Sequence, residues 1–423
     1  MTTISTSAGM TIDDDGRALK AKFARAERAR QIKAAGLVAP LLAFVLITFV
    51  VPIGLMMYRS VDDPVAVRAI PRTLELLNHW SPDSAPPEAV FKVLGEELLS
   101  ARESGDLGKL ATRLNYDVPG TRSTLMRTAR AMRRGPAEGR SHRDLFETID
   151  PKWRGGEILA GLKSLNSPYT RSYYLAAADL TTNLYGDIVA KPPHQRIYVS
   201  LFVKTLWVSL LVTALCILLA YPVAYQMATL PAATANLLMI LVLLPFWTSL
   251  LVRTTAWIVL LQSNGVLNDL LVATGILGDE GRIQMIYNMF GTVVAMTHIL
   301  LPFMVLPLYS VMKTIPPNYL RAAESMGAPP ARAWLDIYLP LTLPGAGAGS
   351  ILVFILCIGY YITPELVGGR TGQLISSAIA YHMQSSLNWG LAAALGTLLL
   401  VGVLALYWLY NRIAGVDSLR MGG

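Results

Sequence analysis

Long apolar stretches with almost no charge alternate with polar segments along this chain. The first, 36–57, contains no charged residue and has about the 20 residues that a helix needs to cross a bilayer. Five further stretches of this kind follow, at 199–227, 237–261, 290–312, 345–363 and 389–410. The pattern therefore predicts six membrane-spanning helices.

The segment between the first two spans, 58–198, has a different composition. Its charges are dense, and its apolar residues recur at helical spacing, as at Val90, Val93, Leu94 and Leu98. No alternation typical of strands is sustained. We therefore expect a small helical domain, long enough to bury a core of its own.

Basic residues beside the spans predict how the chain lies in the membrane. The tail 1–35 carries a basic run directly before the span 36–57, and such runs mark the cytoplasmic side. After six spans the tail 412–423, with Arg412 and Arg420, returns to that side. We expect both termini to be cytoplasmic, the domain 58–198 to be extracytoplasmic, and the five-span core 199–411 to carry a cytoplasmic loop at 313–344.

Composition supports a membrane protein and excludes several other classes. The 423 residues are 53% hydrophobic and only 15% charged, with a mean hydropathy of +0.45. The net charge of +8 does not indicate a nucleic-acid partner, because no basic stripe accompanies a reading motif. Cys216 and Cys357 both lie in apolar stretches and give no disulfide or metal spacing. No phosphate loop or hydrolase motif is present. We therefore expect no catalytic, cofactor-binding or metal residues, and no enzyme.

The loop 313–344 is a polar, helix-prone island between two apolar stretches. Asn318 suits the N-cap of a short helix, and Gly327 suits a left-handed residue that ends it. Pro329 and Pro330 then suit the first turn of a second helix. We expect a helix, a sharp turn and another helix.

The spacing within this loop resembles the EAA loop of ABC importer permeases. Ala322 and Ala323, then Gly327, then Ile337 and Leu339-Pro340 match its pattern at every interval. One position departs from it. Arg321 occupies the place of the family's glutamate, and Glu324 lies one turn further on, where the two charges could pair. The resemblance extends over about 204–411, where the sequence is similar to the spermidine/putrescine subfamily of these permeases.

This resemblance implies an all-α, six-span permease with the type I ABC importer transmembrane fold, carrying the inserted helical domain. It implies a multi-pass protein of the bacterial inner membrane that takes up a polyamine such as putrescine or spermidine. The implied partners are two cytoplasmic ATPase subunits that hold ATP and Mg, a second permease subunit, identical or different, and an extracytoplasmic solute-binding protein. The residues expected to couple the permease to the ATPases are Arg321, Ala322, Ala323, Glu324, Gly327, Ile337, Leu339 and Pro340.

A second group of residues, near the inferred outer half of the spans, is a candidate for the substrate path: Trp247, Arg253, Trp257, Tyr360, Tyr361 and Glu365. Arg253 is a charge within a span, and it either lines the path or reaches the outer headgroups. The aromatic residues form either an interfacial belt or a cage for an ammonium group. His298, in the stretch 290–312, is a packing residue or a proton relay.

A function from another class is a membrane-anchored receptor that senses a ligand through the domain 58–198. A receptor needs neither the EAA spacing nor six spans. Co-purification with an ATP-hydrolysing subunit distinguishes the two functions.

Overall fold

The computed structural model describes residues 11–134 and 140–414. The chain divides into two compact units, 1–58 and 59–423. In the first unit, α1 (Thr11–Val45) continues through a π-helical turn, η1 (Leu46–Val50), into α2 (Val51–Arg59). Pro52 explains the wide turn, because proline has no amide hydrogen and its ring would clash with a carbonyl in a regular α-helix.

The second unit begins with residues 59–197, which we call the inserted domain. Its helices are α3 (Val65–Ala69), α4 (Pro71–Asn78), α5 (Glu88–Glu103), α6 (Leu107–Asp117), α7 (Thr121–Ala131), α8 (His142–Ile149), η2 (Pro151–Trp153) and α9 (Glu157–Ser164). They enclose one hydrophobic core, centred on Phe91, Phe146 and Trp153, whose neighbouring rings meet edge to face at 5.4 and 4.9 Å. Val90, Leu94 and Leu98 are fully buried in it, which confirms the helical periodicity.

The end of the inserted domain departs from the all-helical expectation. After α10 (Ser172–Ala177), strands β1 (Leu180–Thr182) and β2 (Ile188–Ala190) form an antiparallel hairpin, followed by η3 (Pro193–Gln195). The side chain of Asn183 accepts hydrogen bonds from the amides of Tyr185 and Asp187, at 3.0 and 2.8 Å, and so closes the turn. Strands of three residues are too short to give a readable alternation.

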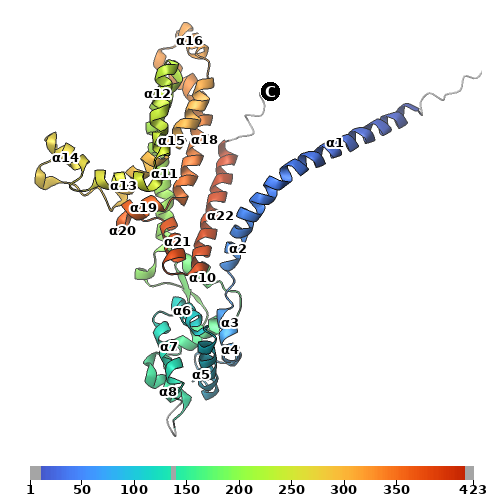
Figure 1. The fold of residues 1–423 in the computed structure, drawn as a ribbon, viewed down its shortest axis with the longest axis vertical. Helices are drawn as coiled ribbons and strands as arrows, with labels where there is room; N and C mark the ends of the chain where they lie inside the picture. Colours follow the sequence, from blue (N-terminus) through green and yellow to red (C-terminus); the bar gives the residue numbers. More distant parts are fainter. Residues whose placement is uncertain (1–10, 135–139, 415–423) are drawn as a thin grey trace, which may run out of the picture. The chain divides into compact units, whose positions relative to one another are not determined.

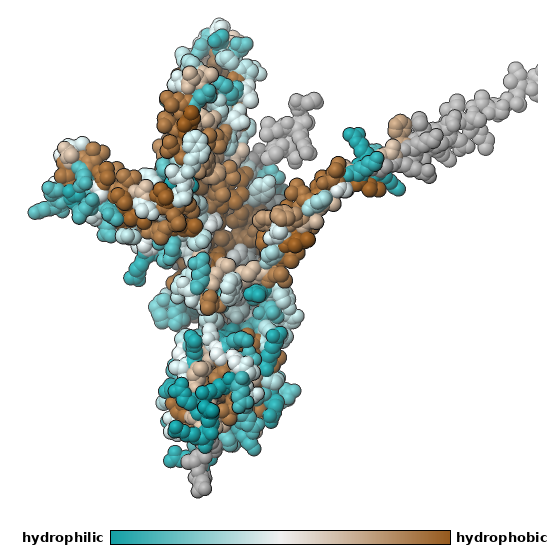
Figure 2. Space-filling model, in the orientation of Figure 1, coloured by the Kyte–Doolittle hydropathy of each residue, from teal (hydrophilic) through white to brown (hydrophobic). Residues whose placement is uncertain are grey.

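Three long helices form the centre of residues 198–414, which we call the core: α11 (Tyr198–Thr229), α15 (Met289–Thr314) and α18 (Leu339–Gly359) run side by side (Figure 1). Between α18 and the last helix, α22 (Trp389–Ala414), lie α19 (Ile362–Val367), α20 (Gly369–Gly372) and α21 (Ile375–Gln384). Hydrophobic residues cover the core helices, whereas hydrophilic residues dominate the surface of the inserted domain (Figure 2). In the described residues six helices are long and apolar enough to cross a membrane, which confirms the expected number of spans.

The expected third span, 237–261, is wrong as a single helix. The structure divides it into α12 (Ala232–Leu243), η4 (Leu244–Trp247) and α13 (Leu250–Leu261), followed by α14 (Val266–Ala273) and η5 (Asp279–Gly281). The break follows from Pro245, and from Thr248 and Ser249, which are extended; the Ser249 hydroxyl then caps α13 by accepting from the Val252 amide at 3.2 Å. The segment with the length and hydropathy of a span is Leu250–Ala273.

The fifth span also differs from the expected 345–363. Helix α18 begins at Leu339, directly after the loop, and ends at Gly359. Pro340 follows the π-helical turn Trp334–Tyr338 as Pro52 follows η1, and Pro344 lies inside α18. Because proline usually interrupts a helix, the sequence predicts a start after Pro340 and Pro344, which is later than the observed one.

Glycines of α18 permit close packing against neighbouring helices, and two of them give a prediction with a matched control. A Cβ at Gly345 would lie 3.0 Å from the Pro307 carbonyl oxygen, whereas a Cβ at Gly347 would meet only the movable end of Tyr410. We expect Gly345→Ala to destabilise the chain by about 1–3 kcal/mol, because backbone must move. Gly347→Ala should be neutral or stabilising, since alanine is the better helix former. Melting temperatures of both variants in detergent check this, and equal values would contradict it.

Candidate coupling loop and transport pathway

The loop after α15 folds as a helix, a turn and a helix. Helix α16 (Asn318–Ser325) is followed by α17 (Pro330–Ala333) and a π-helical turn, η6 (Trp334–Tyr338), that leads into α18. Asn318 is not the N-cap, contrary to expectation. Pro317 occupies that position with helical dihedral angles and no side-chain cap, since the two prolines before Asn318 already bring the backbone close to helical geometry.

Gly327 ends α16 in the left-handed conformation, with a φ of +90°, as predicted. The Ala328 amide donates to the Ala323 carbonyl at 3.0 Å, and the Gly327 amide donates to the Glu324 carbonyl at 2.9 Å. Hydrogen bonds of this type satisfy carbonyls that a helix end leaves free. Pro330 then opens α17, which also confirms the expectation. The turn therefore depends on one glycine.

Aromatic contacts attach the loop to α11. Trp334 packs edge to face on Tyr221, with ring centres 5.6 Å apart, and Tyr338 packs in the same way on Tyr225 at 5.5 Å. The Tyr221 hydroxyl lies 3.1 Å from the hydroxyl of Thr342 in α18. A displacement of the loop would therefore be transmitted to both α11 and α18.

The expected coupling residues divide into those that are at least partly buried and those that are exposed. Ala323 is buried, and Ile337 and Leu339 are half-buried. The remaining members are exposed: Arg321, Ala322, Glu324, Gly327 and Pro340. In the described part of the loop Arg321 and Glu324 form no ion pair, and the ion pair present joins Arg332 to Asp336 at 3.3 Å. An exposed ion pair contributes little stability, because ordering two long side chains costs conformational entropy. Both charges are thus available to a partner.

The structure brings part of the predicted pathway group together. Arg253 lies in the first turn of α13, one helical turn before Trp257. The hydroxyl of its neighbour Thr254 lies 3.3 Å from that of Thr363, three residues after Tyr360. The Trp257 indole N–H donates to His298 Nδ1 at 3.2 Å, with ring centres 5.3 Å apart. We call Arg253, Trp257, His298 and Tyr360 the Arg253 cluster.

The other predicted pathway residues are exposed, and their side chains make no described contact with this cluster. Trp247 is 74% exposed at the break between α12 and α13, and Tyr361 and Glu365 are exposed around the start of α19. In the described residues no hydrogen bond or ion pair joins their side chains to the cluster. His298 was not among the expected pathway residues, since a lone histidine in an apolar stretch gives no pattern. Its partner Trp257 lies on another helix, so only the fold shows the pair.

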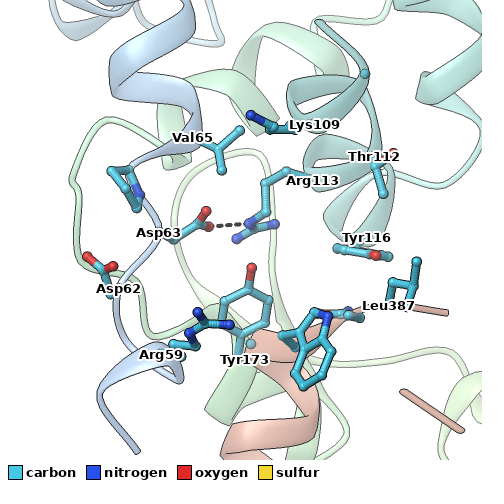
Figure 3. Close-up of a pocket in the computed structure, with 15 residues that line it drawn as sticks. Arg59, Asp62, Asp63, Val65, Lys109, Thr112, Arg113, Tyr116, Tyr173 and Leu387 are labelled. Carbon is cyan, nitrogen blue, oxygen red and sulfur yellow. Dashed lines mark hydrogen bonds and ion pairs between the residues drawn. The ribbon is translucent and has the colours of Figure 1, made fainter. Parts of the chain in front are cut away.

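A cavity that the sequence did not predict lies where the inserted domain meets the start of α22. It has a volume of about 520 Å³, and its wall includes Arg59, Lys109, Tyr116, Leu387 and Trp389 (Figure 3). The Tyr116 hydroxyl donates to the Ser386 carbonyl at 3.2 Å, so the inserted domain holds the segment that precedes α22.

Known proteins share the permease core. Residues 206–415 match the family described as "Binding-protein-dependent transport system inner membrane component". The spermidine/putrescine transport system permease protein PotB of Haemophilus influenzae is 32% identical over 249 residues, covering 56% of this chain and 86% of the relative. The inner membrane ABC transporter permease protein YdcU of Escherichia coli is 33% identical over 231 residues, covering 52% of this chain and 73% of the relative.

A solved structure, a bacterial alginate ABC transporter in complex with an alginate-bound periplasmic protein, is similar at 18% identity and a TM-score of 0.45, covering 52% of this chain and 79% of that one. The match to the family begins at residue 206 and so leaves the inserted domain outside. Over this core, the chain belongs to the family of binding-protein-dependent transport system inner membrane components and is a permease of the ABC importer type.

Proposed function

We propose that this chain is a membrane subunit of an ATP-driven importer for small amine-bearing solutes, with putrescine and spermidine as the first candidates. The observation that carries the proposal is the similarity to spermidine/putrescine permeases, since the chain covers 86% of one of them. An extracytoplasmic binding protein would deliver the solute. Two cytoplasmic ATPase subunits would bind ATP and Mg, and a second permease subunit, identical or different, would complete the pathway.

The proposed orientation has both termini and the loop at α16 in the cytoplasm, and the inserted domain on the outer side. The exposed edge of α16 would meet the ATPases. Their closure would move α16, and the contacts of Trp334 and Tyr338 would transmit this movement to α11. The spans would thereby expose the pathway to one side of the membrane and then to the other.

The test is to purify the chain from native membranes and to reconstitute the complex in vesicles. We expect an ATP-hydrolysing subunit to co-purify, and radiolabelled putrescine to accumulate only with ATP and the binding protein, with competition by unlabelled spermidine. A chain that purifies without such a subunit, and that binds a ligand through the inserted domain alone, would be the receptor instead.

The charges of α16 give a further prediction. Because Arg321 is exposed and unpaired in the loop, we propose that it meets an acidic group on the ATPase. Arg321→Glu should then weaken ATPase attachment at least about tenfold through like-charge repulsion, although it restores the family's residue. Glu324→Gln is the matched control, with a mild effect. Pull-down of the ATPase at low and high salt measures attachment. Full attachment of Arg321→Glu would contradict this role.

A further inference from the structure

The positive charge of Arg253 has no counter-charge within the described chain. Its Nε atom is buried and has no hydrogen-bond acceptor, and none of the ion pairs among the described residues includes Arg253. Arg113 and Arg282 differ, because each of them contacts two carboxylates. An unpaired charge in a membrane span is costly and normally faces a partner group or an aqueous cavity.

The helix that carries Arg253 adds to the positive potential. Arg253 is the fourth residue of α13, one turn after the cap Ser249. The amide groups at a helix N-terminus carry a partial positive charge, so a cation there is unfavourable unless an anion is near. The side chain and the helix end therefore both favour a negative group at this position.

His298 offers a second hydrogen-bond donor to a negative group beside Arg253. The indole N–H of Trp257 can only donate, so His298 Nδ1 is the acceptor and the proton of the neutral imidazole lies on Nε2. That N–H has no hydrogen-bond partner among the described residues. His298 is exposed, while Arg253, Trp257 and Tyr360 are half-buried. The cluster thus includes, within the described chain, a guanidinium whose Nε has no acceptor, an imidazole N–H without a partner, and two aromatic rings.

We infer that the Arg253 cluster binds an oxyanion. This inference rests on the proposed function and adds to its substrate class linear amino compounds that end in an acid group. A carboxylate or phosphonate of the solute would accept from Arg253 and from His298 Nε2, and the aromatic rings would border its aliphatic chain. The phosphate of a lipid headgroup has the same chemistry, and the experiment separates these two sources.

The probes are putrescine and 4-aminobutanoate, which differ in having an amine or a carboxylate at one end. ATP-driven uptake of both is measured in vesicles that hold the complete complex. In Arg253→Gln we expect 4-aminobutanoate uptake to fall at least about tenfold while putrescine uptake is unchanged or rises, because a fixed positive charge repels a diamine. Arg253→Lys should retain part of the 4-aminobutanoate uptake. The matched control is Lys204→Gln, which removes a positive charge from α11 without this selectivity.

A second arm replaces the phospholipid with a phosphate-free galactolipid. If the oxyanion is a headgroup phosphate, the wild type should lose uptake of both solutes in galactolipid, and Arg253→Gln should be insensitive to the lipid. Equal loss of both solutes in Arg253→Gln while the wild type transports equally well in both lipids, or no loss at all, overturns the inference.

A binding measurement separates the inference from the proposed function. Titration with 4-aminobutanoate should change the fluorescence of Trp257, taken as the difference between wild type and Trp257→Phe, and Arg253→Gln should abolish the change. This result supports the oxyanion site even if no solute is transported with ATP. Absence of ATP-driven transport would refute the proposed function alone. Absence of the change in wild type, in vesicles that transport putrescine, overturns the assignment of a solute oxyanion.

Discussion

Gly327→Val is expected to abolish ATP-driven uptake while the chain still accumulates in the membrane. The φ of Gly327 is +90°, a conformation that costs a residue with a side chain about 1–2 kcal/mol, and a β-branched residue more. A Cβ at this position would touch nothing within 4 Å. The damage is therefore confined to the backbone: the turn would open, the hydrogen bond from Ala328 to Ala323 would be lost, and α16 and α17 would separate.

The control for this prediction is Gly327→Asn, because asparagine tolerates the left-handed conformation better than other residues with a side chain. It should keep most of the uptake, with Gly327→Ala between the two. The measurements are membrane abundance, ATPase pull-down and putrescine uptake for all three variants. Normal uptake by a normally assembled Gly327→Val complex would show that the turn does not couple the permease to the ATPases.

Sequence reasoning located the loop correctly because each of its features is local. A helix that ends at Gly327 and a second helix that begins at Pro330 require only the properties of glycine and proline. The error at Asn318 is also local, since side-chain preference was given more weight than the two prolines before it. By contrast, hydropathy alone could not show the break at Pro245, because the residues on both sides are equally apolar.

The candidate pathway could be predicted only in part, because its residues meet through the fold. Arg253 and Trp257 are one helical turn apart, and their proximity follows from the sequence. His298 reaches them from α15, and Tyr360 reaches them from the end of α18. The same limit applies to Asp63 and Arg113, 50 residues apart, which neither spacing nor composition connects.

Replacement of Arg113 should produce the largest loss of stability in the inserted domain. The guanidinium is buried and pairs with Asp63 through Nε (Figure 3). It contacts Asp117 at 2.8 Å and donates to the Ser172 hydroxyl at 2.7 Å. It also lies over the Tyr173 ring, 4.9 Å from its centre. Arg113→Met leaves two carboxylates without a counter-charge, which costs about 3–5 kcal/mol when such a pair is buried.

The comparison variant is Lys109→Met on the same helix. Lys109 pairs with Asp106 at 2.8 Å, but its side chain is 71% exposed, so little stability should be lost. Limited proteolysis and thermal unfolding of the full chain measure both effects. An Arg113→Met chain as stable as Lys109→Met would show that the buried network does not hold the domain together.

The loss in Arg113→Met should also depend on pH, and the sign follows from Asp117. Burial raises the pKa of the Asp117 carboxyl, and Arg113 counteracts this rise. Without the guanidinium, the pKa in the folded protein should rise further above its value in the unfolded chain. A group of this kind favours folding below its unfolded pKa, and that contribution is lost as the pH rises through the folded pKa. The variant should therefore come closest to wild-type stability in acid, where the Asp117 carboxyl is protonated, and fall furthest behind at neutral pH. A difference that stays constant across this range would mean that lost packing, rather than uncompensated charge, causes the instability.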